Sequence, residues 1–140
     1  MNKKQLWLKT ALSLLVSAVA FPGSLPAHAG FDGTNCTWGG EWNSYWSYAD
    51  GSKAASKLLI TPNSNGIKGI YETGAFEGTV VKGKPWLVRG KWWQTQGSQA
   101  SGNFLFKMTI DRSGKACNLT GQWSSGNSTP NLSWDAIQKW

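Results

Sequence analysis

Hydrophobic and polar residues alternate along most of the chain after residue 35, and turn-forming residues interrupt this alternation at short intervals. A period of two places successive side chains on opposite faces of a β-strand, so each stretch predicts a strand with one buried and one solvated face. The connections between the stretches are short enough for hairpins, which predicts an antiparallel up-and-down meander. The predicted strands lie at residues 36–48, 57–61, 67–73, 76–81, 86–95, 101–110, 117–124 and 132–138.

A glycine stands two residues before an aromatic residue five times in these strands, at Gly40, Gly69, Gly90, Gly102 and Gly121. The spacing puts the glycine and the ring on the same face of the strand. Glycine weakens the middle of a strand, so its recurrence indicates strong coiling, or the close approach of another backbone or a large side chain. A tightly curved barrel filled by aromatic rings would use both.

One face of the predicted strands carries no charged residue, whereas the opposite face carries many. Because eight strands suffice to close a barrel, this division predicts an all-β, eight-stranded antiparallel barrel, with a two-sheet β-sandwich as the alternative. The uncharged face consists of Trp38, Gly40, Trp42, Leu58, Ile60, Ile67, Gly69, Tyr71, Phe76, Gly78, Val80, Trp86, Val88, Gly90, Trp92, Gly102, Phe104, Phe106, Met108, Leu119, Gly121, Trp123, Trp134 and Ala136. The charged face includes Glu41, Lys57, Lys68, Glu72, Glu77, Arg89, Lys91, Lys107 and Asp135.

Residues 1–29 have the pattern of a secretory signal peptide. Three lysines precede an apolar run at residues 10–21, and Ala27 and Ala29 supply the small residues that signal peptidases require. The alternative, a transmembrane anchor, needs about 20 apolar residues, and Pro22 ends the run well short of that. We therefore expect a protein that is secreted or periplasmic.

The predicted mature chain, residues 30–140, fits a single domain. It keeps eleven Lys and Arg and seven Asp and Glu, a formal net charge of +4 that is typical of a solvated surface. The one histidine of the sequence, His28, falls in the predicted leader. A chain without histidine lacks the commonest general base and the usual metal ligand, so we predict no cofactor and no metal site.

The chain has two cysteines, Cys36 and Cys117. Export to an oxidising compartment favours a disulfide between them, with two free thiols as the alternative. The predicted meander agrees with the bond, because its first and seventh strands run in the same direction and both cysteines then lie at the same end.

Residues 36–42 (Cys-Thr-Trp-Gly-Gly-Glu-Trp) resemble the C-x-x-x-G-x-W opening of avidin-type barrels. Residues 69–71 are similar to the G-x-Y of their third strand, residues 134–136 resemble their last strand, and the repeated G-x-aromatic strands also resemble lipocalin-like barrels. The resemblance implies an eight-stranded barrel that binds a ligand at one mouth and that can form oligomers. The chain departs from the avidin pattern where Ser44 replaces an asparagine and Asn43 stands one position early, so biotin binding is not carried over.

Two groups of aromatic residues are candidates for contact with a ligand or partner. Inward tryptophans can stack on a ligand or simply fill a small barrel. Aromatics beside a polar turn, or pointing outward, suit sugars and flat ligands, or partial burial at a rim or in an oligomer contact. The candidates are Trp42, Tyr45, Trp46, Tyr48, Trp93, Trp123 and Trp134.

The charged residues give little support for catalysis or for nucleic-acid binding. Glu41, Glu72 and Glu77 fall on the predicted outer wall and Asp50 in a turn, without a desolvated cleft to shift a pKa, so we predict no enzyme. A basic stripe on the outer wall is typical of solubility, with weak attraction to anionic envelope polymers or lipids as the alternative. The stripe consists of Lys82, Lys84, Arg89, Lys91 and Lys107.

Together these observations predict an exported binding protein that holds a small apolar or sugar-like ligand at a Trp-lined barrel mouth. The alternative is a protein-interaction module, such as an inhibitor of a secreted enzyme or an adhesin-type domain, that uses exposed aromatics. The expected partner is thus a small molecule, a glycan, or a secreted or envelope protein. We expect neither nucleic-acid binding nor stable membrane insertion.

Overall fold

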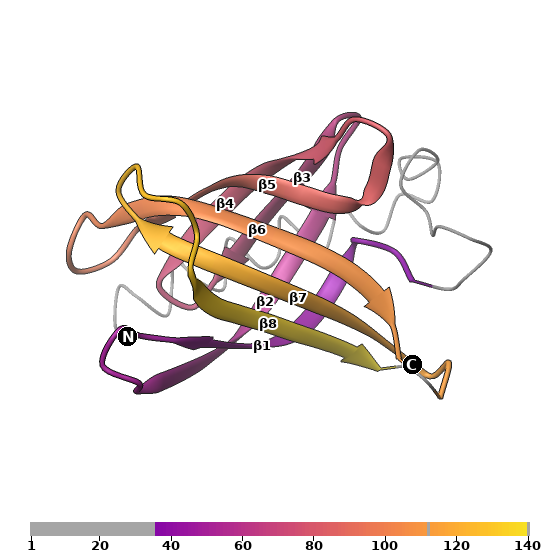
Figure 1. Cartoon of the computed structure of the whole chain (residues 1–140), viewed down its shortest axis with the longest axis horizontal. Helices are drawn as coiled ribbons and strands as arrows, with labels where there is room; N and C mark the ends of the chain where they lie inside the picture. The colour runs from indigo at the N-terminus through magenta and orange to yellow at the C-terminus, as the bar shows by residue number, and fades with distance from the viewer. Residues whose placement is uncertain (1–35, 112, 140) are drawn as a thin grey trace, which may run out of the picture.

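The computed structural model describes residues 36–111 and 113–139, and these residues form eight strands and no helix. Consecutive strands pair antiparallel and β8 pairs with β1, so the sheet closes into a barrel in meander order (Figure 1). The strands are β1 (Gly40–Ser47), β2 (Lys53–Pro62), β3 (Gly66–Tyr71), β4 (Gly74–Val81), β5 (Lys84–Gln94), β6 (Ser101–Ile110), β7 (Ala116–Ser125) and β8 (Leu132–Lys139). The predicted barrel is confirmed and the β-sandwich alternative is wrong. The predicted signal peptide at residues 1–29 lies outside the described residues.

The strand boundaries differ from the prediction where the alternation of the sequence is weak. β2 begins at Lys53 rather than at residue 57, because the small and polar residues 53–56 pair with the last four residues of β1. The turn between β3 and β4 lies at residues 72–73, so Gly74 begins β4 instead of forming the turn. β1 begins at Gly40 rather than at residue 36. Local patterning thus located each strand but not its ends.

The glycines that precede aromatic residues make room for neighbouring groups. A Cβ on Gly69 would contact the Phe76 ring, and a Cβ on Gly121 would contact the Phe106 ring. At Gly90 and Gly102 a Cβ would instead contact backbone atoms of the adjacent strand. The predicted close approach is therefore confirmed at these four glycines, where a ring or the backbone of a neighbouring strand occupies the space of a Cβ.

Gly40 differs from the other four glycines of the pattern. Its φ of 103° lies in the left-handed region that favours glycine. A Cβ at this position would contact the side chain of Gln138 and no ring. It therefore serves the backbone turn into β1 and does not make space beside a ring.

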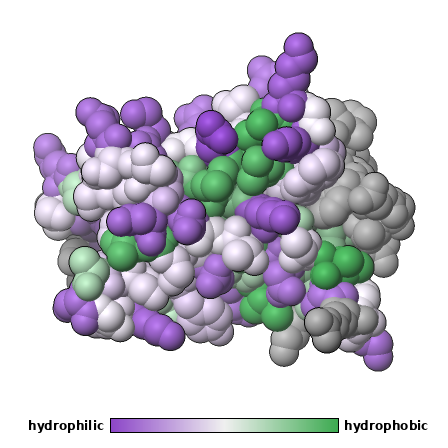
Figure 2. Space-filling view, in the orientation of Figure 1, coloured by the Kyte–Doolittle hydropathy of each residue, from purple (hydrophilic) through white to green (hydrophobic). Residues whose placement is uncertain are grey.

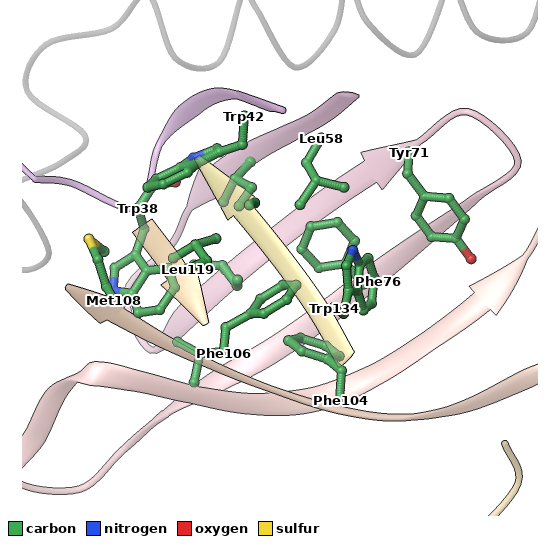
Figure 3. Packing of buried hydrophobic residues seen from close by; sticks show 14 of the residues in the cluster. Trp38, Trp42, Leu58, Tyr71, Phe76, Phe104, Phe106, Met108, Leu119 and Trp134 are labelled. Carbon is green, nitrogen blue, oxygen red and sulfur yellow. The ribbon is translucent and has the colours of Figure 1, made fainter. Parts of the chain in front are cut away.

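A disulfide and two tryptophans close one end of the barrel. Cys36 and Cys117 are bonded, as predicted, and both are fully buried. The Trp38 indole N–H donates to the Pro85 carbonyl at 3.0 Å, and the Trp42 N–H donates to the Trp38 carbonyl at 3.1 Å. Trp38 thereby links the segment before β1 to β5 across the interior. The core continues from this end through aliphatic and aromatic side chains (Figure 3).

The outer wall is polar. The charged residues predicted to face solvent are all exposed, and Lys57 Nζ lies 2.6 Å from Glu41 Oε1 in an ion pair between β2 and β1. Figure 2 shows one side of this wall, where hydrophilic residues and residues of intermediate hydropathy cover most of the surface and hydrophobic residues gather in separate patches. Among residues 36–111 and 113–139, no helix is long and apolar enough to cross a membrane.

Candidate functional site

The end of the barrel opposite the disulfide contains a pocket of about 380 Å³, which we call the mouth pocket. Four connections surround this end, at residues 48–52, 72–73, 95–100 and 126–131, and it lies at the left in Figure 1. The pocket volume falls in the lower part of the ~300–1,000 Å³ range of small-molecule sites. Its lining consists of Trp46, Tyr48, Tyr71, Trp92, Gln94, Ser98, Ala100, Trp123, Ser125 and Trp134.

Aromatic rings form the floor and walls of the mouth pocket, and they hold one another edge to face. The Trp134 ring lies 6.3 Å from that of Trp46 and 5.8 Å from that of Tyr71, measured between centroids. On the other side, the Trp123 ring lies 5.5 Å from that of Trp92 and 6.0 Å from that of Tyr48. Edge-to-face pairs of this kind are favourable, so the rings present a preformed apolar surface.

Three aromatics that line the mouth pocket have a hydrogen-bond partner within the protein for their polar group. Trp92 Nε1 donates to the Ser124 carbonyl at 2.9 Å, and Trp123 Nε1 donates to the Ser47 carbonyl at 3.0 Å. The Tyr71 hydroxyl donates to the Trp93 carbonyl at 3.1 Å.

Burial raises the pKa of Tyr71, and the neighbouring Tyr48 hydroxyl raises it further. Tyr71 therefore remains a neutral hydroxyl at any physiological pH.

Trp134 is the exception among these aromatics. Its side chain is 4% exposed, and its buried indole N–H has no hydrogen-bond partner within residues 36–111 and 113–139. A buried donor without an acceptor costs about 1–3 kcal/mol, and such a group in a native structure needs an explanation. The nitrogen atom has almost no accessible surface, so it lies beneath the lining of the mouth pocket and not at the surface that a ligand would contact.

Among the described residues, no charged side chain lines the mouth pocket. Gln94, Ser98 and Ser125 place amide and hydroxyl groups among the rings, and these groups both donate and accept hydrogen bonds. The pocket therefore combines flat apolar surfaces with neutral polar groups, which suits an uncharged ligand that has a flat face and oxygen atoms at its edge.

The structure brings four of the seven sequence candidates together. Trp46, Tyr48, Trp123 and Trp134 line the mouth pocket. Trp42 does not: it is fully buried beside Trp38 near the closed end, so its place among the contact candidates is corrected to the core. The two-residue alternation placed Trp42 on the inner face but did not resolve its depth along the barrel axis.

Tyr45 and Trp93 lie on the outer wall, outside the mouth pocket. Their exposed fractions are 53% and 37%. They belong to β1 and β5, which are four strands apart in the closed barrel and so lie on opposite sides of it. The two rings therefore do not form one continuous aromatic surface.

Sequence reasoning missed several residues of the pocket. Tyr71 and Trp92 were assigned to the inner face but not to a site, although each lies in the last residues of an odd-numbered strand, as Trp46 does. In a meander all odd-numbered strands end at the same end of the barrel, so this signal was present in the sequence. Ser98 and Ala100 lie in the connection before β6, where no periodic pattern exists.

Neither carboxylates nor metal ligands gather at the mouth pocket. Within the part of the chain that the structure describes, no three His, Cys, Asp or Glu side chains lie together as a metal site would require. Asp50 lies in the exposed turn after β1, where hydrogen bonds from Ser52 lower its pKa. It is therefore an ionised turn residue.

Comparison with protein-family models, with curated proteins and with solved structures finds no match to this chain. The resemblance to avidin-type and lipocalin-like barrels therefore stays an expectation from short motifs. Inferences about function rest on the geometry and chemistry of the site itself.

Proposed function

We propose that this chain is an extracytoplasmic, non-enzymatic binding protein that holds one small uncharged ligand, apolar or sugar-like, in the mouth pocket. The lining of the mouth pocket carries the proposal, because it joins flat aromatic rings to neutral amide and hydroxyl groups in an opening of ligand size. The disulfide supports the location, since such bonds persist in oxidising compartments. The position of Glu41, Glu72 and Glu77 on the exposed wall supports a role without catalysis.

The lining favours a sugar-like ligand over a purely aliphatic one. A pyranose ring offers a flat face of C–H groups for stacking and several oxygens that accept hydrogen bonds. An aliphatic chain would fill the same volume but would desolvate Gln94 and the serine hydroxyls without replacing their hydrogen bonds. Charged ligands are disfavoured because the pocket holds no counter-charge.

A fluorescence titration tests the proposal. The disulfide-bonded protein is titrated with neutral mono- and disaccharides, a fatty acid and biotin, and tryptophan emission is recorded. We expect a saturable change with a neutral sugar, because any ligand in the pocket lies against several indoles. Trp46→Ala, which removes one wall of the pocket, should abolish the change, whereas the matched control Trp93→Ala on the outer wall should retain it.

The opposite result would refute the proposal. If no ligand of the panel changes the emission, or if both variants respond as the parent protein does, the mouth pocket is not the binding site.

The exposure of Tyr45 and Trp93 favours a second candidate function, a protein-interaction module. Because the two rings lie on opposite sides of the barrel, a partner of ordinary size would contact one of them. A purified secreted protein that binds the parent chain should then lose affinity on either Tyr45→Ala or Trp93→Ala but not on Trp46→Ala. This pattern is the reverse of the one expected for the mouth pocket.

A further inference from the structure

A second depression lies on the outside of the barrel, where a convex wall would ordinarily offer none. Its volume is about 490 Å³, and we call it the outer groove. It is lined by Arg89, Gly90 and Lys91 of β5, by Asn103, Phe104 and Leu105 of β6, by Gln122 of β7 and by Asn127, Ser128, Thr129 and Pro130 of the following loop.

The loop between β7 and β8 creates the outer groove by folding back against the wall (Figure 1). The Ser128 carbonyl accepts two side-chain hydrogen bonds, from Ser124 Oγ at 2.6 Å and from Asn103 Nδ2 at 3.1 Å. The Gly126 N–H donates to the Ser101 carbonyl at 2.8 Å. Ser124 is buried by this contact, so the raised edge of the groove is held by specific bonds.

Opposite the loop, the groove is edged by two cations. Arg89 and Lys91 are both exposed, and neither forms an ion pair with a carboxylate among the described residues. Glu77 lies across the ladder from Lys91 but not within ion-pair distance. Two unpaired cations on one strand therefore face a row of amide and hydroxyl groups across the groove.

The floor and the far edge add apolar and neutral polar surface. Leu105 and Pro130 offer aliphatic faces, and Gln122, Asn127 and Thr129 offer donors and acceptors that no other described side chain occupies. The groove thus offers cations on one edge, neutral polar groups on the other and aliphatic surface between them. A matching ligand carries anionic groups along one side, hydroxyl groups along the other, and C–H faces between them. Saccharide chains that bear carboxylates have this arrangement, whereas two cations are few for a nucleic-acid backbone.

We propose that the outer groove binds an acidic polysaccharide, with Arg89 and Lys91 holding carboxylates of consecutive sugars and the 127–130 loop contacting their hydroxyls. This site is separate from the mouth pocket, and it assigns to part of the basic stripe a role beyond solubility. The two cations act as charge-assisted hydrogen-bond donors in an exposed groove, so binding weakens as salt is added.

Isothermal titration calorimetry with polygalacturonate tests the proposal, with its fully methyl-esterified form as a neutral ligand on the same backbone. We expect binding of the acid form only. Arg89→Gln with Lys91→Gln should weaken it about ten-fold or more, since bonds to charged groups are the strong ones. Lys53→Gln with Lys115→Gln removes the same charge from exposed sites that do not line the groove and should leave the affinity within about two-fold.

Three results would overturn the proposal. Equal losses in the two double variants would show that overall charge, and not the groove, attracts the polymer. Equal binding of polyglutamate would show that the sugar is not recognised. Loss of polygalacturonate binding in Trp46→Ala would place the polymer in the mouth pocket, so this inference and the proposed function fail by different results.

Discussion

Two matched substitutions test whether the buried indole N–H of Trp134 is without a partner. Trp134→Phe and Trp42→Phe each replace a buried tryptophan of the barrel interior by the same smaller ring, and the two parent side chains are 4% and 0% exposed. They differ in the hydrogen bonding of the indole N–H, because that of Trp42 donates to the Trp38 carbonyl whereas that of Trp134 has no partner among the described residues. The difference between the two effects on unfolding free energy therefore isolates the cost of the unpaired donor.

The size of the expected difference in unfolding free energy follows from the surroundings of the two indole N–H groups. Trp→Phe removes a similar volume in both cases, so the loss of packing largely cancels in the comparison. Trp42→Phe also loses a buried hydrogen bond, which contributes about 1 kcal/mol, whereas Trp134→Phe removes a penalty of about 1–3 kcal/mol. We therefore expect Trp134→Phe to be less destabilising than Trp42→Phe by about 2–4 kcal/mol.

Urea denaturation followed by far-ultraviolet circular dichroism measures both variants without added ligand. Equal destabilisation by the two substitutions would refute the reasoning, because it would mean that Trp134 Nε1 already has an acceptor, such as a buried water molecule.

Three further outcomes follow from the fold. Cys36→Ala with Cys117→Ala opens a loop of sequence separation 81 and should lower the unfolding free energy by about 4.5 kcal/mol on the chain-entropy estimate, as measured by urea denaturation. Gly102→Ala would force a Cβ against a backbone carbonyl of β7 and should cost about 1–3 kcal/mol in the same assay; an unchanged midpoint would contradict the close strand approach. Hydrogen bonds from the Ser113 hydroxyl and then from backbone N–H groups lower the pKa of Asp111 below 3.8, so its contribution to stability is present above that value and is lost as the pH falls through the lowered folded-state pKa. Asp111→Asn should accordingly flatten the acid side of the stability curve between about pH 2 and pH 5, and an unaltered curve would contradict this assignment.

The sequence predicted the barrel because the signals that specify it are local and repeated. Alternation with a period of two assigned Trp38 and Phe106 to the interior, and Glu77 and Lys91 to solvent, and all four lie as predicted. The disulfide was predicted from the presence of two cysteines and a predicted export signal. Neither prediction required knowledge of how distant segments pack.

The remaining features depend on contacts between distant segments, which no periodic pattern reveals. The outer groove exists because Asn103 and Ser124 bind the carbonyl of Ser128 in a loop, and this conformation has no counterpart in hydrophobic patterning. The unpaired donor of Trp134 is likewise a property of the assembled core, since other tryptophans in the same barrel find backbone acceptors. Sequence reasoning identified four of the six aromatic residues that line the mouth pocket, but not which of them has an unpaired donor.

The two ends of the barrel also differ in how firmly their strands are held together. The disulfide between Cys36 and Cys117 and the hydrogen bond from Trp38 to Pro85 fasten the end far from the mouth pocket. A ligand bound as proposed would enter and leave between the loops of the mouth, while the fastened end keeps the strands in register. Its association and release should then proceed far faster than global unfolding, and a stronger link at the far end would prolong the lifetime of the folded protein without slowing ligand exchange.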